Sequence, residues 1–243
     1  MKLYPNPAVR PAGPYPHCTC FNMDGRKHPR RAPLLHSVEQ DQKAPAWADL
    51  LQRVEDAARQ NAEEFTPLEG LSGEDRATIV TLPPSIATLT TVRRLNLYGS
   101  HLTRLPPELG QMRSLVSLDV YTSRCLHYLP FEVTRCQLRE SRMSTRALYG
   151  NYKFRAPFPD LEHSRNVEVL AREGLKHCSV CDAALVAPAP VVRWITLRVG
   201  TDWVPLLVAA CSTRCISSLP TPPAGYVPYP HTGGADLQQP PCE

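Results

Sequence analysis

The chain has 243 residues, 42% of them apolar, and a formal net charge of +4 from 27 basic and 23 acidic side chains. This length is enough for one domain with or without a small satellite, and so small a basic excess gives no argument for nucleic-acid binding. Since no run of 18 consecutive apolar residues occurs, we expect neither a transmembrane helix nor a membrane partner.

Prolines at positions 5, 7, 11, 14, 16, 29 and 33 predict a mostly extended N-terminal arm over residues 1–40. Residues 1–10 lack the apolar core of a secretory signal, so we expect a reducing, cytoplasmic setting. In that setting the nine cysteines are expected to be metal ligands or buried thiols, not a disulfide framework.

Two polar features of the arm are ambiguous. Residues 26–31 form a short basic run, which we interpret as a solvated surface rather than a nucleic-acid contact. A group of histidines and cysteines is a candidate metal site, but its spacing fits no standard loop, so the favoured interpretation is ordinary surface residues. The group consists of His17, Cys18, Cys20, His28 and His36.

An amphipathic helix is predicted over residues 41–66. Apolar side chains recur at helical spacing from Trp47 to Phe65, and Pro45 suits the first helical turn. The apolar stripe needs a partner, so we expect this helix to cap the segment that follows.

Residues 67–150 contain an internal repeat. Its Leu-Pro steps are 23 and then 24 residues apart, beginning at Leu82, Leu105 and Leu129. Between them an L-x-x-L-x-L type of pattern begins at Val92 and Leu115, and a degenerate copy begins at Leu138. Cys125 and Cys136 fall inside this region, where cysteine is usually a small buried hydrophobe.

The pattern resembles the leucine-rich repeat. The resemblance implies an α/β fold, namely a short leucine-rich-repeat solenoid in which each unit adds one strand to a shared core. The helix over 41–66 would cap one end, and an aromatic, proline-containing loop over 151–175, with Arg146–Leu161, would close the other. The family has asparagine after each strand, whereas this chain has Ser100 and Ser123, which can make part of the same hydrogen bonding.

In leucine-rich repeats the side chains that alternate with the core leucines point outward from the concave face. Tyrosine and arginine, which are common in binding hot spots, occur at these positions. We therefore predict a partner-binding surface made of Arg94, Asn96, Tyr98, Ser117, Asp119, Tyr121, Glu140, Arg142 and Ser144.

Residues 176–219 carry the second strong pattern, two cysteine pairs separated by a predicted β-hairpin. Four thiolates on two short loops fit a closed tetrahedral site, so we predict a structural zinc ion in a small, zinc-ribbon-like lobe. The predicted ligands are Cys178, Cys181, Cys211 and Cys215. The alternatives are free thiols, a redox pair, or His177 replacing one thiolate. The tail over 220–243, which includes Cys242, is expected to be extended or disordered.

The combination of a short repeat array with a C-x-x-C…C-x-x-x-C tail resembles a set of small intracellular leucine-rich-repeat proteins. The resemblance implies a scaffold that binds another protein and is not an enzyme. The sequence has no G-x-S-x-G, phosphate-loop or H-E-x-x-H motif. The alternatives are an adaptor that recruits substrates to a ubiquitin ligase and a cysteine-dependent redox enzyme.

Overall fold

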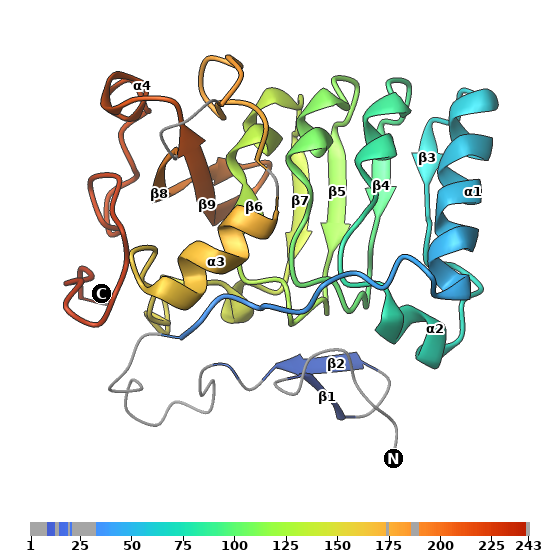
Figure 1. Cartoon of the computed structure of the whole chain (residues 1–243), viewed down its shortest axis with the longest axis horizontal. Helices are drawn as coiled ribbons and strands as arrows, with labels where there is room; N and C mark the ends of the chain where they lie inside the picture. The colour runs from blue at the N-terminus through green and yellow to red at the C-terminus, as the bar shows by residue number, and fades with distance from the viewer. Residues whose placement is uncertain are drawn as a thin grey trace.

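The computed structural model describes residues 9–12, 15–18, 20, 33–173, 175–185 and 190–241. These residues form a mixed α/β structure with three β-sheets (Figure 1). The basic run at 26–31, His28 and Cys242 lie outside the described residues. Within the described part, no helix is long and apolar enough to cross a membrane.

The largest sheet is parallel and has the strand order β3-β4-β5-β7. Its strands are β3 (Glu64–Phe65), β4 (Arg94–Asn96), β5 (Ser117–Val120) and β7 (Glu140–Met143). β4, β5 and β7 begin at intervals of 23 residues, the period of the sequence pattern. Their register follows that period, because Leu95 pairs with Leu118 and Leu118 with Ser141.

Each Leu-Pro step leads into a short 3-10 helix on one face of this sheet. The helices are η1 (Pro84–Thr88), η2 (Pro107–Gln111) and η3 (Phe131–Arg135). A proline precedes each helix in the extended conformation, and a second proline at the start of η1 and η2 suits a position whose amide lacks a helical partner. The leucines of strands and helices meet between the two layers and are almost completely buried.

Buried serines connect the turns that follow β4 and β5. Ser123 Oγ accepts hydrogen bonds from Ser100 Oγ at 2.8 Å and from Ser100 N at 3.1 Å. It also donates to the Leu97 carbonyl at 2.9 Å. Both serines are at most 1% exposed, so their hydroxyl groups join the two turns inside the core.

Helix α1 (Pro45–Arg59) covers the β3 end of the sheet (Figure 1). Trp47, Leu50 and Val54 are buried against the core, as the amphipathic pattern predicts. The helix ends earlier than the predicted residue 66. Asn61 has a φ of 49°, a left-handed conformation that stops the helix, and Phe65 then enters β3. Helix α2 (Gly73–Thr78) follows and begins at the capping residue Ser72.

The predicted hairpin is present as β8 (Val191–Val199) and β9 (Asp202–Ala210). β9 also pairs in parallel with β6 (Leu129–Pro130), so the hairpin and the parallel sheet are joined. Alternate side chains of the hairpin enter two different cores. Ile195 and Leu206 lie in the core of the parallel sheet, whereas Trp194 lies in a second, aromatic core.

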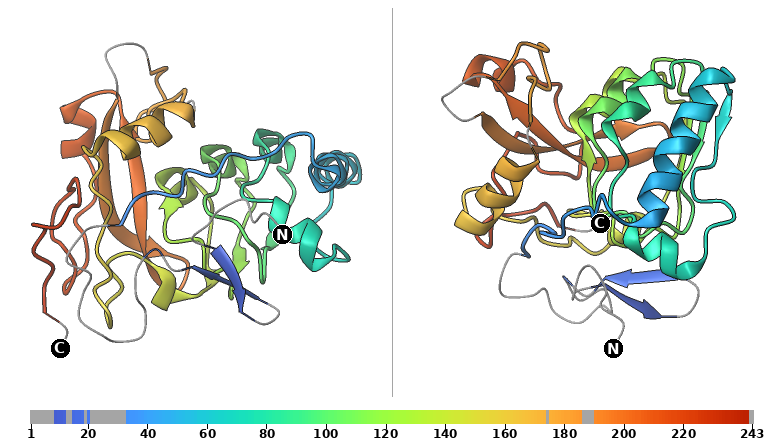
Figure 2. Two further views of the ribbon diagram at one scale, coloured as in Figure 1. Left: turned by 60° about the horizontal axis from the view of Figure 1, so that its bottom comes forward. Right: turned by 45° about the vertical axis from the view of Figure 1, so that its right-hand side comes forward.

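This arrangement corrects the expected closure at Arg146–Leu161. The β8–β9 hairpin closes that end of the main core, with its turn against Ser141, whose hydroxyl donates to the Val199 carbonyl at 2.8 Å. Tyr149 and Phe158, from the predicted capping loop, pack instead on Trp194 on the other side of the hairpin. Figure 2 shows the hairpin between the sheet and the C-terminal segments.

The remaining segments pack around these two cores. Helices η4 (Thr145–Ala147), α3 (Ser164–Arg172) and α4 (Thr213–Ser217) lie in the C-terminal half. The tail over 220–241 is irregular but fixed, because His231 exchanges backbone hydrogen bonds with Trp194 and Arg155 donates to the Pro241 carbonyl. The structure therefore disagrees with a disordered tail over these residues.

The described part of the N-terminal arm has two pieces. β1 (Val9–Ala12) and β2 (Tyr15–Cys18) form an antiparallel hairpin. Residues 33–44 run across the molecule from α3 to α1 (Figure 1). Hydrogen bonds fix this second piece, including Arg104 to the Val38 carbonyl at 2.8 Å and Val80 N to Gln40 Oε1 at 2.9 Å.

Candidate functional site

The nine side chains predicted to bind a partner lie on one exposed face, which we call the strand face. All nine are exposed or half-buried, and the face is the one opposite η1, η2 and η3. The strand face consists of Arg94, Asn96, Tyr98, Ser117, Asp119, Tyr121, Glu140, Arg142 and Ser144.

Neighbouring strands bring complementary side chains of this face together. The rings of Tyr98 and Tyr121 have centroids 6.2 Å apart, and the Arg142 guanidinium lies 5.6 Å from the Tyr121 centroid. Arg142 also pairs with Asp119 at 2.9 Å. Asp119 accepts a hydrogen bond from Tyr121 N, which fixes its carboxylate on the face. The result is a patch of two neighbouring tyrosines beside an oriented ion pair.

The four cysteines predicted as metal ligands come together in one cluster. Cys178 and Cys181 lie on a tight turn closed by the β-bridge between His177 and Ala184. Cys211 follows β9, and Cys215 lies in α4. All four sulfur atoms lie within 4.8 Å of one another, so the cluster can hold a metal ion.

The sulfur spacing fits a tetrahedral ion. Cys211 Sγ lies 3.6 Å from both Cys181 Sγ and Cys215 Sγ. A tetrahedral site with zinc–sulfur bonds of about 2.3 Å requires sulfurs about 3.8 Å apart, whereas a disulfide requires about 2.05 Å. The four cysteines are therefore free thiols arranged at the spacing of a metal site.

Backbone amides stabilise a thiolate at the buried member of the cluster. Cys181 N and Cys211 N donate to Cys178 Sγ at 3.5 Å and 3.3 Å. Burial raises the pKa of Cys178, but the amide donors outweigh burial and bring this pKa down to about 6. At Cys215 the Ser212 hydroxyl favours the thiolate, but the neighbouring cysteines together raise the pKa to about 12.

The cluster is anchored to the rest of the molecule by Ser179 and Arg135. Ser179 exchanges hydrogen bonds with Ala209 of β9, through its amide at 2.8 Å and its hydroxyl at 2.9 Å. Arg135 of η3 donates to the Cys178 and Ser179 carbonyls and pairs with Asp182 at 2.9 Å. The cluster is thus continuous with the core, and not on a separate lobe.

A second cluster contains three residues of the candidate metal site in the N-terminal arm, for which ordinary surface residues were the favoured interpretation, and one residue that the sequence did not point to, His127. Cys18 and His36 are buried, not on the surface as expected, and they lie beside Cys20 and His127. His127 is separated from the cysteines by more than 100 residues and belongs to no local motif. The ligand atoms of these four residues also lie within 4.8 Å of one another, so this cluster too can hold a metal ion.

The two remaining cysteines of the described residues, Cys125 and Cys136, lie outside both clusters. Cys125 is completely buried, and burial raises its pKa to about 12, so its thiol is neutral. Cys136 is half-buried and packs on the main core, where burial raises its pKa to about 11.

No protein-family model, curated protein or solved structure matches the chain. The functional proposal therefore depends on the residues and their geometry.

Proposed function

We propose that this chain is a leucine-rich-repeat protein whose strand face binds another protein. Its support is the coincidence of a 23-residue sequence period with the strand register, which aligns Leu95 with Leu118 and Asn96 with Asp119. The units of β4 and β5 bury leucines on one side of the sheet, and all three units display polar or aromatic side chains on the other.

The observation that carries the binding proposal is the patch around Tyr121 and Arg142. Tyr121 is 45% exposed although it packs against Tyr98, and Arg142 is oriented by Asp119. Aromatic and arginine side chains that are already held in place lose little conformational freedom on binding, which makes them effective anchors. Four short strands offer a small area, so the partner is expected to bind mainly through this patch.

We further propose that the four-cysteine cluster binds zinc in a structural role. Four sulfur ligands leave no open coordination position, and thiolates favour zinc over magnesium or calcium. The hydrogen bond from Arg135 of η3 to the Cys178 carbonyl supports this structural role. A zinc ion in the cluster would connect η3, through this loop, to the hairpin that closes the core. The alternative of a redox enzyme needs an accessible thiolate, whereas Cys178, whose pKa is lowered, is 0% exposed.

The test is affinity capture from native lysate, followed by titration calorimetry with the purified partner. Tyr121→Ala/Arg142→Ala should weaken the interaction at least about tenfold, as expected for hot-spot residues. The matched control is Gln111→Ala/Arg113→Ala, two exposed positions at η2, on the opposite side of the sheet. Equal affinities of the two double variants would overturn the strand face as the binding surface.

A further inference from the structure

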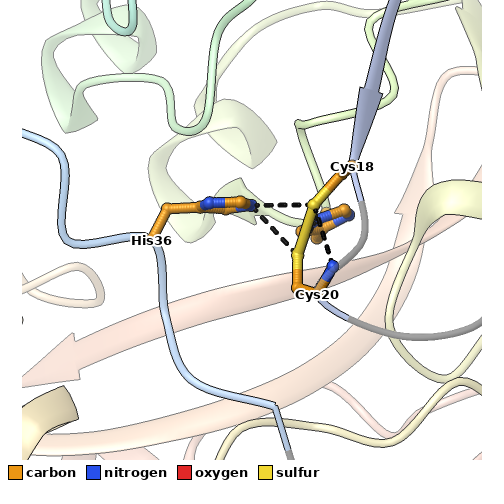
Figure 3. Close-up of side chains that lie close together, drawn as sticks. Cys18, Cys20 and His36 are labelled. Atoms are coloured by element: carbon orange, nitrogen blue, oxygen red, sulfur yellow. Dashed lines mark hydrogen bonds between the residues drawn. A yellow bond between two sulfur atoms is a disulfide. The ribbon is translucent and has the colours of Figure 1, made fainter. Parts of the chain in front are cut away.

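The second cluster joins three parts of the chain that are distant in sequence. Cys18 ends β2 and Cys20 follows it, His36 lies on the segment that crosses the molecule, and His127 precedes β6. Cys20 Sγ lies 3.3 Å from His36 Nε2 and 3.0 Å from His127 Nε2. Cys18 Sγ lies 3.5 Å and 3.2 Å from the same two nitrogens. Figure 3 shows the His36 ring directed at both sulfur atoms.

We infer that Cys18, Cys20, His36 and His127 form a second metal site, which takes a zinc-type divalent cation and fastens the N-terminal hairpin to the folded body. Two thiolates and two imidazoles are a standard tetrahedral donor set for zinc. The inference concerns a different site from the four-cysteine cluster and does not depend on the proposed binding function.

The orientation of His127 supports a ligand role. Its Nδ1 lies 2.6 Å from the Ala147 carbonyl oxygen, which can only accept a hydrogen bond, so Nδ1 carries the proton. The lone pair of Nε2 is then directed at Cys18 and Cys20. A histidine that binds a metal through one nitrogen almost always donates from the other to a carbonyl or carboxylate.

The spacing and burial also fit a closed site. Ideal tetrahedral zinc with two sulfur and two nitrogen ligands places sulfur about 3.6 Å from nitrogen. The four sulfur–nitrogen distances, from 3.0 to 3.5 Å, are close to this value and leave room for one ion after a small expansion. Cys18, His36 and His127 are each at most 8% exposed, so water has little access to the centre.

In the structure Cys18 and Cys20 are joined as a disulfide (Figure 3). A bond between residues two positions apart closes a very small loop and connects no distant segments, so it does not account for the two imidazoles around it. A metal ion at the same place would join all three segments. The disulfide and the metal complex are therefore two exclusive forms of one site.

The conversion between the forms balances with a thiol reductant. Two molecules of a small thiol reduce the disulfide to two cysteine thiols and become one disulfide themselves. Zinc then replaces the two thiol protons, which are released to solvent, and the imidazole nitrogens complete the site. The metal-bound form is expected in the reducing setting that the cysteine content suggests.

The test is the zinc content of the purified full-length chain by elemental mass spectrometry after reduction with a phosphine. The wild type should hold about two zinc ions per chain, one in each cluster. Cys18→Ser/Cys20→Ser should lose one of them, and Cys211→Ser/Cys215→Ser should lose the other. Cys125→Ala is the matched control, because Cys125 is buried next to Cys18 but is not one of the four ligands, and it should keep both.

A second measurement separates metal binding from the disulfide. His36→Ala leaves both thiols in place but removes one ligand, so it should weaken the second zinc ion at least about tenfold in competition with a chelator. Cobalt bound to Cys211→Ser/Cys215→Ser should give the visible spectrum of a tetrahedral site with two sulfur and two nitrogen ligands. A reduced wild type with only one zinc ion, unchanged by Cys18→Ser/Cys20→Ser, would overturn the inference while leaving the four-cysteine cluster intact.

Discussion

Replacement of Ser123 by alanine should destabilise the fold more than its small size suggests. Ser123 Oγ makes three hydrogen bonds at a site that is 1% exposed, and its loss leaves the Ser100 hydroxyl without that acceptor in the core. A lost hydrogen bond plus an unsatisfied buried hydroxyl costs about 2–3 kcal/mol. For a chain of this size the midpoint of thermal unfolding should fall by about 4–12 °C.

Substitution of the partner serine, Ser100, should lower the free energy of unfolding by less. Ser100→Ala removes one hydrogen bond but leaves Ser123 Oγ bonded to the Leu97 carbonyl and to the amide of residue 100, so we expect about 1 kcal/mol. In the double variant, Ser100→Ala removes the hydroxyl group that Ser123→Ala leaves without its acceptor. The combined loss should therefore be smaller than the sum of the two single losses by about 1 kcal/mol.

The assay is urea unfolding followed by tryptophan fluorescence, with Ser85→Ala as the control. Ser85 is exposed on η1, and its substitution should change the free energy of unfolding by less than about 0.5 kcal/mol. Equal losses for Ser100→Ala and Ser123→Ala, or additivity in the double variant, would refute the assigned hydrogen-bond directions and the role of the serines in joining the turns.

Three further predictions concern the C-terminal half. Burial lowers the pKa of His231 to about 4, so below pH 6.5 the unfolded chain takes up a proton that the folded chain does not. His231→Gln should therefore remove about 2 kcal/mol of the stability that the wild type loses between pH 7.5 and 4.5, as measured by urea unfolding at the two pH values. Arg135→Ala should weaken zinc binding at the four-cysteine cluster about 10–100-fold in chelator competition, because it supports that loop without being a ligand. Gly200→Ala should lower the free energy of unfolding by about 2–4 kcal/mol, because the added Cβ would lie 2.7 Å from the Glu140 backbone. The control is Gly70→Ala, which is also at positive φ but in open space, and it should lower the free energy of unfolding by only about 1–2 kcal/mol.

The strands and the hairpin could be predicted because their signals are local and periodic. A 23-residue offset between Leu95 and Leu118 fixes which residues lie side by side, and alternation then decides which side chains are exposed. The same reasoning placed all nine residues of the strand face on exposed or half-buried positions. The four-cysteine cluster was predictable for a related reason, because two short loops joined by a hairpin can meet only at its base.

The helix boundary and the closure of the core were not predictable in this way. The helical pattern continues to Phe65, but a left-handed Asn61 ends the helix, and a periodicity argument does not detect one backbone conformation. The uninterrupted run of side chains without charge over residues 203–210 of β9 indicates burial but does not say which segments cover it. The hairpin proved to have a core on each side, which displaced the predicted capping loop to the outer side.

The Cys18 cluster shows why a candidate metal site assembled from distant segments is hard to recognise in a sequence. Its cysteines form a short pair whose spacing is uninformative, and His127 lies in a stretch interpreted only as part of the repeat. His127 stands where the preceding unit has Thr103, another buried polar residue, so a polar side chain at this position does not by itself indicate a ligand. His127 is 2% exposed, and a buried imidazole needs partners for both nitrogens, which only the structure supplies.

The four-cysteine cluster lies at one end of a sheet of four short strands, where the core needs a cover. A short array leaves a large fraction of its core exposed at the ends, so each end must be covered. α1 covers the β3 end mainly by apolar packing, through Trp47, Leu50 and Val54. The opposite end is covered by the β8–β9 hairpin, whose base carries the four cysteines. Because Arg135 ties the cysteine loop to η3, a metal ion at the base of the hairpin would help to hold in place the element that closes the core.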